Sequence, residues 1–170
     1  MIKKAKSLLF SNRKNKQDQK KEAKSSDDSE KLLESDKQLN NPLSQEKHGI
    51  DKSKEPPVEL LESLINLYSE GKYSESLALI NDLLDQFPYS VDLYNIAGAS
   101  NAGLRKFDTS IENYKQVIKI NPDFADAHNN MGNAFLGKEK LDEAIASYKK
   151  ATLINPDYTE AYLNLGNAFM

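Results

Sequence analysis

Apolar residues in the second half of the chain recur at the spacing of amphipathic helices. In the stretch of residues 125–158, two such runs are separated by a short polar turn at residues 137–140. The first run consists of Ala127, Met131, Ala134 and Phe135, and the second of Leu141, Ala144, Ile145, Tyr148 and Ala151. The pattern therefore predicts a helix, a tight turn and a second helix.

This pattern repeats with a period of 34 residues. The segment from Ile120 to Leu136, INPDFADAHNNMGNAFL, returns from Ile154 to Met170 as INPDYTEAYLNLGNAFM, with ten of 17 residues identical. Pro88, Pro122 and Pro156 share the interval, and each should end a helix because proline cannot continue one. A fixed period of this length predicts a stack of helical hairpins.

Small residues occur where the two helices of each hairpin should approach closely. Gly98, Gly132 and Gly166 are equivalent on the first helices, whereas Ser76, Ser110 and Ala144 are equivalent on the second helices. Larger side chains would force the helices apart, because protein interiors are too densely packed to absorb them. A third equivalent set is expected to fill the end of each hairpin: Tyr73, Phe107 and Leu141.

These positions resemble the tetratricopeptide repeat (TPR). Its pattern is carried in one unit by His128, Met131, Gly132, Phe135, Ala144, Tyr148, Ala151 and Pro156. The departures are His128 and Asn101 at aromatic positions and Leu64 at the first glycine position. The resemblance implies an all-α fold, a right-handed superhelical solenoid of TPR helix-turn-helix units. It also extends to the first helix of a fourth unit, which carries Tyr162, Leu165 and Phe169. We expect the chain to be the front of a longer protein, and the alternative is that this helix serves as an imperfect cap.

Composition divides the chain into two parts. Residues 1–55 hold 14 Lys and Arg against 10 Asp and Glu, with few apolar residues, whereas residues 56–170 hold 9 against 16. Only the second part can bury a core that offsets its ordering entropy. We therefore expect a disordered basic tail and polar linker at residues 1–56 and a TPR array at residues 57–170. Its units should span about residues 57–90, 91–124, 125–158 and 159–170.

The basic end of the tail has several interpretations. Lys3–Lys24 holds nine cations and two anions, and its apolar patch is too short for a signal peptide. A solvated tail is the favoured interpretation, and weak contact with an anionic membrane surface is the alternative. Nucleic acid is not expected as a partner, although the charge alone would allow non-specific binding.

The sequence contains no recognisable motif for catalysis or metal binding. Two histidines and no cysteine cannot assemble a zinc site or a Cys/His dyad, and no phosphate-binding loop occurs. Asp108 and Asp142 are better explained as caps of the helices that follow them. We therefore expect no catalytic residue, cofactor or metal. The lack of cysteine and of a long apolar run favours a cytoplasmic protein.

A binding surface is expected on the first helices of the units, which line the concave side of such a stack. Its candidate groove residues are Asn95, Asp126, Asn129, Asn130, Asn133, Glu160, Asn164 and Asn167. Asn130 is equivalent to Asn164, and Asn133 to Asn167, so carboxamides form two rows. This arrangement resembles the asparagine ladder of O-GlcNAc transferase-like repeat arms, which implies binding of peptide backbone groups. The competing interpretation is that these asparagines are small polar fillers.

The sequence thus predicts a protein-protein interaction module that binds an extended peptide segment in the concave groove and is not itself an enzyme. The family's other peptide-binding mode, a clamp for a terminal carboxylate, needs Lys and Arg on these helices and is rejected. The alternative function is the amino-terminal recognition arm of a longer enzyme, a glycosyltransferase, sulfotransferase or methyltransferase, whose catalytic domain would follow Met170.

Overall fold

The structure, a computed structural model, describes residues 55–170, and within this range it is built of α-helices without a strand. The helices are α2 (Val58–Ser69), α3 (Tyr73–Gln86), α4 (Val91–Gly103), α5 (Phe107–Ile120), α6 (Ala125–Gly137), α7 (Leu141–Ile154) and α8 (Thr159–Asn167). The predicted disorder of residues 1–56 concerns a segment that lies outside the described residues, apart from Glu55 and Pro56.

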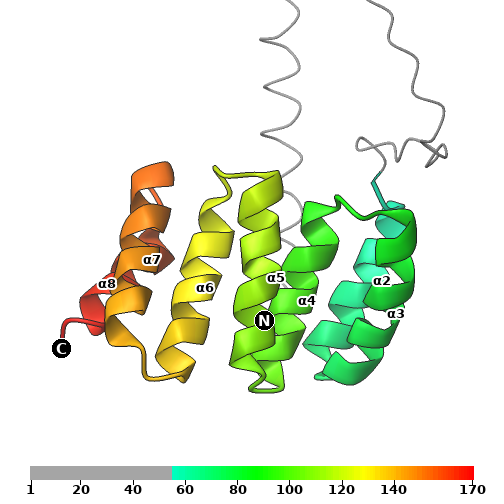
Figure 1. Cartoon of the computed structure of the whole chain (residues 1–170), viewed down its shortest axis with the longest axis horizontal. Helices are drawn as coiled ribbons and strands as arrows, with labels where there is room; N and C mark the ends of the chain where they lie inside the picture. Colours follow the sequence, from blue (N-terminus) through cyan, green and yellow to red (C-terminus); the bar gives the residue numbers. More distant parts are fainter. Residues whose placement is uncertain (1–54) are drawn as a thin grey trace, which may run out of the picture.

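The helices form consecutive antiparallel hairpins, α2 with α3, α4 with α5 and α6 with α7, and α8 packs on α7. We call α2, α4, α6 and α8 the A helices and α3, α5 and α7 the B helices. Figure 1 shows the helices in chain order, from α2 and α3 at the right to α8 at the left. Each B helix also contacts the next A helix, so the core continues from one repeat to the next. In the described part of the chain, no helix combines the length and apolarity needed to cross a membrane.

The turns inside the hairpins share a left-handed residue. Gly71, Arg105 and Glu139, each one repeat apart, have φ angles of 76°, 59° and 60°. Next to the second of these residues, the amide of Lys106 donates to the carbonyl of Asn101 at 2.8 Å, which closes the end of α4. Such a left-handed residue commonly terminates a helix and is usually glycine. Only the first repeat uses glycine at this position.

Close helix contacts confirm the prediction for Gly98 and Gly132. A Cβ atom placed on Gly98 would lie 2.6 Å from the Tyr114 ring, and one on Gly132 would lie 2.5 Å from the Tyr148 ring. Real Cβ atoms do not approach other atoms so closely, so a larger side chain would displace these rings. A Cβ on Gly166 would meet nothing within 4 Å. Of these three equivalent glycines, only Gly98 and Gly132 are therefore constrained by an aromatic ring.

The first repeat solves the same packing problem with a different pair. Leu64 replaces the glycine on α2, and Ile80 replaces the tyrosine on α3. Both are fully buried in one core cluster, at 1% and 0% exposure. Two side chains of equal size therefore replace a glycine and a tyrosine, so the side chain on the A helix is larger and the one on the B helix is smaller than in the other repeats. This exchange explains why the departure from the repeat pattern leaves the hairpin intact.

The residues predicted to fill the hairpin ends have more than one packing role. The centroid of the Tyr73 ring lies 5.4 Å from that of Tyr68 in its own hairpin, as predicted. The Tyr73 ring also packs against Gly103, and the Phe107 ring packs against Gly137, so both contact the A helix of the following repeat. Leu141, the third member of the set, is 47% exposed and does not fill the end of its hairpin. The contacts with the following repeat were not predictable from sequence spacing alone.

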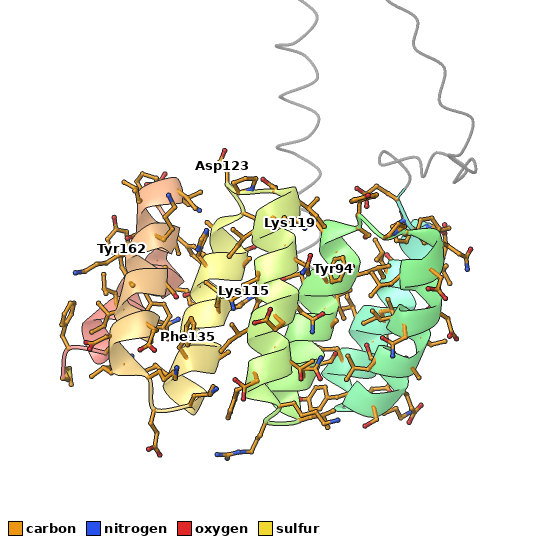
Figure 2. All side chains as sticks on the ribbon, in the orientation of Figure 1. Tyr94, Lys115, Lys119, Asp123, Phe135 and Tyr162 are labelled. Carbon is orange, nitrogen blue, oxygen red and sulfur yellow. The ribbon has the colours of Figure 1, made fainter. Side chains whose placement is uncertain are left out.

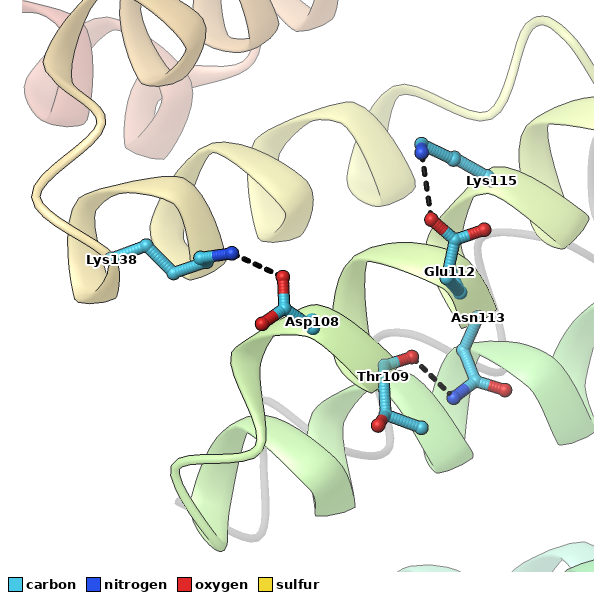
Figure 3. Close-up of polar contacts among 6 residues, drawn as sticks. All are labelled: Asp108, Thr109, Glu112, Asn113, Lys115 and Lys138. Atoms are coloured by element: carbon cyan, nitrogen blue, oxygen red, sulfur yellow. Dashed lines mark hydrogen bonds and ion pairs between the residues drawn. The ribbon is translucent and has the colours of Figure 1, made fainter.

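A polar contact also ties two repeats together. Asp108 of α5 pairs with Lys138, which follows α6 (Figure 3). Asp108 was predicted to cap α5, but the helix begins at Phe107 and has no side-chain cap. The carboxylate lies in the first turn instead, where it still favours the positive end of the helix dipole. Figure 3 also shows the neighbouring pair of Glu112 and Lys115, 2.7 Å apart.

Candidate functional site

The predicted groove residues all lie on A helices. Asn95 is on α4; Asp126, Asn129, Asn130 and Asn133 are on α6; Glu160, Asn164 and Asn167 are on α8. Asn129 and Asn133 of α6 contact Asn164 of α8 across the junction between two repeats. Asn95 belongs to the preceding repeat.

Burial divides the asparagines into two groups. Asn95 and Asn129 are 6% and 0% exposed, so neither can contact a ligand directly. The remaining four are accessible, with Asn133 and Asn167 exposed and Asn130 and Asn164 half-buried. A ligand can therefore contact fewer asparagines than the sequence predicted.

An amide network joins α6 to α8. The Nδ2 group of Asn164 donates to Oδ1 of Asn129 at 2.9 Å and to Oδ1 of Asn133 at 3.4 Å. The hydroxyl of Tyr148 donates to the same Oδ1 of Asn133 at 2.7 Å. Asn164 thus contributes to the contact between repeats. Asn133 has its oxygen engaged, and because oxygen and nitrogen lie on opposite sides of an amide, its Nδ2 group points away from these partners.

Two carboxyl groups lie beside this network. Burial raises the pKa of Asp126, the hydrogen bond donated by Tyr158 lowers it, and the charge of Glu160 raises it further. Burial and the two carboxylates likewise raise the pKa of Tyr158. Burial, with the field of Glu160, raises the pKa of Tyr148 to about 12. The α6–α8 junction is therefore a half-buried, negatively charged environment rich in hydrogen-bonding groups.

Sequence reasoning missed the two tyrosines of this junction. Tyr148 was assigned to packing, yet its hydroxyl positions Asn133. Tyr158 occupies the position of Phe124 one repeat later, and its hydroxyl, which phenylalanine lacks, donates to Asp126. This replacement of Phe by Tyr was the signal available in the sequence.

Charge is distributed unequally between the two helix layers. The A helices hold Glu59, Glu62, Asp92, Asp126 and Glu160, and none of them holds a Lys or an Arg. All cations of the described residues lie on B helices or in turns, as Lys115 and Lys119 do on α5 (Figure 2). We call Asp92, Asp126 and Glu160 the acidic row, since they occupy the same position one repeat apart and are each half-buried.

Comparison with known proteins identifies the repeat. Residues 105–138 and 133–170 each match the family model of the TPR repeat. The described helices also match solved TPR structures, among them the first TPR of Spaghetti (RPAP3) bound to the HSP90 peptide SRMEEVD, with a TM-score of 0.64. The chain has the TPR fold.

Sequence identity to these TPR structures is low. The match to Spaghetti (RPAP3) has 23% identity and covers 72% of this chain and 95% of that one. MamA matches with a TM-score of 0.61 and 24% identity, over 65% of this chain and 64% of the other. The Yersinia enterocolitica secretion chaperone SycD, in complex with a peptide of the translocator YopD, matches with a TM-score of 0.61 and 18% identity, over 66% and 91%. No curated protein sequence matches the chain.

The two other departures from the TPR pattern have packing roles. Asn101 is 5% exposed, and its Nδ2 group donates to the carbonyl of Ala97 at 3.0 Å. His128 is 8% exposed, and burial lowers its pKa. Within residues 55–170, no three His, Asp or Glu side chains gather where a metal ion could bind. Both departures belong to the interior of the TPR array.

Proposed function

We propose that the A helices of this TPR array bind an extended peptide segment of a partner protein. The single observation that carries this proposal is the pair Asn133 and Asn167, which are exposed, equivalent and one repeat apart, beside the acidic row. The solved TPR structures named above include two with a bound peptide, which supports a role of this kind. The protein is then an interaction module, with residues 57–170 as its binding domain and no chemistry of its own.

The asparagines recognise the backbone of the peptide. A carboxamide offers two donors and an acceptor, so it can pair with peptide C=O and N–H groups whatever the peptide's side chains are. Asn133 suits this role because Tyr148 fixes its oxygen and leaves the nitrogen to donate. This is the backbone-reading ladder of O-GlcNAc transferase-like arms, reduced here to the accessible positions. Each bond contributes about 0.5–1.5 kcal/mol, so binding is weak for each rung and improves with repetition.

The acidic row sets a charge preference. The peptide SRMEEVD in the Spaghetti (RPAP3) structure carries three carboxylate side chains. The A helices of this chain contain no Lys or Arg to pair with them. Acidic peptides are therefore disfavoured by Asp92, Asp126 and Glu160, and neutral or basic segments are favoured. A cytoplasmic location is compatible with such a partner.

A binding titration tests the proposal. The double variant Asn133→Ala and Asn167→Ala removes one exposed rung from each of two repeats. Its affinity for extended peptides of unrelated sequence should fall by about 1–3 kcal/mol, and by similar amounts across the panel, because backbone groups are common to all peptides. Asn81→Ala with Asn113→Ala, on B helices, is the matched control and should leave the affinity unchanged. Equal affinity of the wild type and the folded A-helix variant would contradict backbone recognition.

A further inference from the structure

The A-helix layer of the protein has a negative net charge. Five carboxylates lie on the A helices, and every Lys and Arg of residues 55–170 lies elsewhere. Three of the carboxylates form the acidic row, and all three are half-buried. Partly buried charges are screened less by salt and solvent than exposed ones, so this row attracts a cationic segment more strongly than an exposed patch does.

A segment of suitable charge belongs to the same chain. Lys3–Lys24 contains nine cations and two anions, interleaved with small, polar and apolar residues. Residues 25–57 connect it to α2, and a random coil of the same number of residues would have an end-to-end distance of about 30 Å. Successive A helices contact each other, and packed helices lie about 8–10 Å apart, so α6 and α8 lie roughly 20–30 Å from α2 and within reach of the segment. A tether of this kind gives an effective concentration on the order of millimolar.

We propose that the segment Lys3–Lys24 docks in extended form on the acidic row of its own TPR array and competes there with partner peptides. The inference rests on the proposed function, because it assigns a competitor to the same surface. It makes the tail an internal regulator: a partner must displace the segment, and rising ionic strength or neutralisation of its lysines opens the surface.

The junction of α6 and α8 is the strongest part of this docking site. Asp126 and Glu160 repel each other, and the pKa of Asp126 is raised mainly by burial. An ammonium or guanidinium group placed between them relieves both costs. The backbone of the same segment can take the hydrogen bonds of Asn133 and Asn167. Recognition of charge and of backbone are thus provided by one face of the array.

A second acidic helix offers a competing site and therefore a control. The B helix α3 carries Glu75, Asp82 and Asp85, likewise without Lys or Arg. These three carboxylates are exposed, so water and salt weaken their attraction. If charge alone decided docking, α3 would be occupied as readily as the acidic row.

Spin labelling of the full chain locates the tail. The protein contains no native cysteine, so Ser11→Cys provides a single site for a nitroxide label. At low salt, the label should broaden the backbone amide signals of α4, α6 and α8 well beyond those of α3, α5 and α7. The broadening should disappear at about 0.5 M salt, where the Debye length falls to a few ångströms. Broadening centred on the B helices, or absent at low salt, would overturn the proposal.

Matched variants and a mixed sample sharpen the experiment. The triple variant Asp92→Asn, Asp126→Asn and Glu160→Gln should lose the broadening, whereas Glu75→Gln, Asp82→Asn and Asp85→Asn should keep it. The opposite result would overturn the proposal in favour of α3. A mixture of spin-labelled chains and isotope-labelled chains reports only contacts between molecules. Broadening that persists in full in this mixture would mean that the tail docks on a second copy, which also overturns it.

A peptide titration separates this inference from the proposed function. In a full chain with the nine Lys and Arg of the segment replaced by Gln, an added peptide of residues 3–24 should bind about tenfold more tightly than to the wild type. Equal affinity for both chains would overturn the competition and leave peptide binding intact. If the spin label shows that the tail docks but no other peptide binds, the proposed function is contradicted and the docking of the tail is not.

Discussion

At the residue scale, equivalent positions keep their backbone conformation even where the side chain does not favour it. Arg105 and Glu139 take the left-handed conformation that glycine takes at position 71. Left-handed backbone costs a residue with a Cβ atom about 1–2 kcal/mol. The bonds that close the helix end, such as Lys140 N to the Phe135 carbonyl at 2.9 Å, hold the turn in place despite this cost.

Glu139→Gly should therefore stabilise the protein. Glycine removes the strain of the left-handed conformation, and the greater entropy of the unfolded chain offsets part of the gain. We expect the free energy of unfolding to rise by about 0.5–1 kcal/mol in a urea titration. A control substitution at the exposed Asp142, Asp142→Gly, should be destabilising because it lies inside α7. A loss of stability in Glu139→Gly would show that the side chain contributes contacts that outweigh the strain.

His128 gives the folded protein a pH dependence. Its pKa is lowered from the usual 6.5, first by burial and then by the charge of Lys150, against a raising effect of the Pro122 carbonyl. The unfolded chain therefore binds a proton at higher pH than the folded chain does. As pH falls below about 6.5, the free energy of unfolding must decrease.

His128→Tyr should remove this dependence, since Tyr94 and Tyr162 stand at the equivalent positions. Denaturant titrations between about pH 7.5 and pH 5.5 should show a decline of stability in the wild type that is smaller in the variant. Asp126 acts in both proteins and in the opposite sense, because its raised pKa favours protonation of the folded state at lower pH. Parallel pH profiles of the two proteins would contradict the assignment to His128.

At the scale of elements, each hairpin is held by a pair of residues whose volumes compensate each other. Gly98 with Tyr114 and Gly132 with Tyr148 place a large residue on the B helix against a glycine, whereas the first repeat uses Leu64 and Ile80, which are equal in size. The glycines and their helices were predictable from their spacing. The compensating pair of the first repeat was not, because a 34-residue period compares a position with its copies and not with the residue it faces.

Exchange of the pair tests this account. Gly98→Leu alone should destabilise the protein by about 2–3 kcal/mol, because the new side chain would overlap the Tyr114 ring. Adding Tyr114→Ile recreates the arrangement of Leu64 and Ile80, so much of the lost stability should return. Thermal melts of the two single variants and the double variant form a mutant cycle. Additive losses in the double variant would mean that the two side chains do not compensate each other.

At the scale of the whole molecule, the period and the small residues were enough to predict the TPR fold. The binding surface was predictable only in outline. Its helices and charge follow from the sequence, but the burial of Asn95 and Asn129 and the hydroxyl contacts of Tyr148 and Tyr158 depend on how repeats dock. The rotation of each A helix about its own axis, relative to the next repeat, decides which carboxamides remain accessible. A repeat period gives no information on that rotation.

Residue-resolved NMR titration with an extended basic peptide tests the central claim that the A helices form the binding surface. Performed on the full chain with the tail cations neutralised, the titration should shift the amide signals of α4, α6 and α8. The largest shifts should surround Asn133, Asn167 and the acidic row, with α3, α5 and α7 almost unchanged. Shifts confined to the B helices, or none at saturating peptide, would contradict the account.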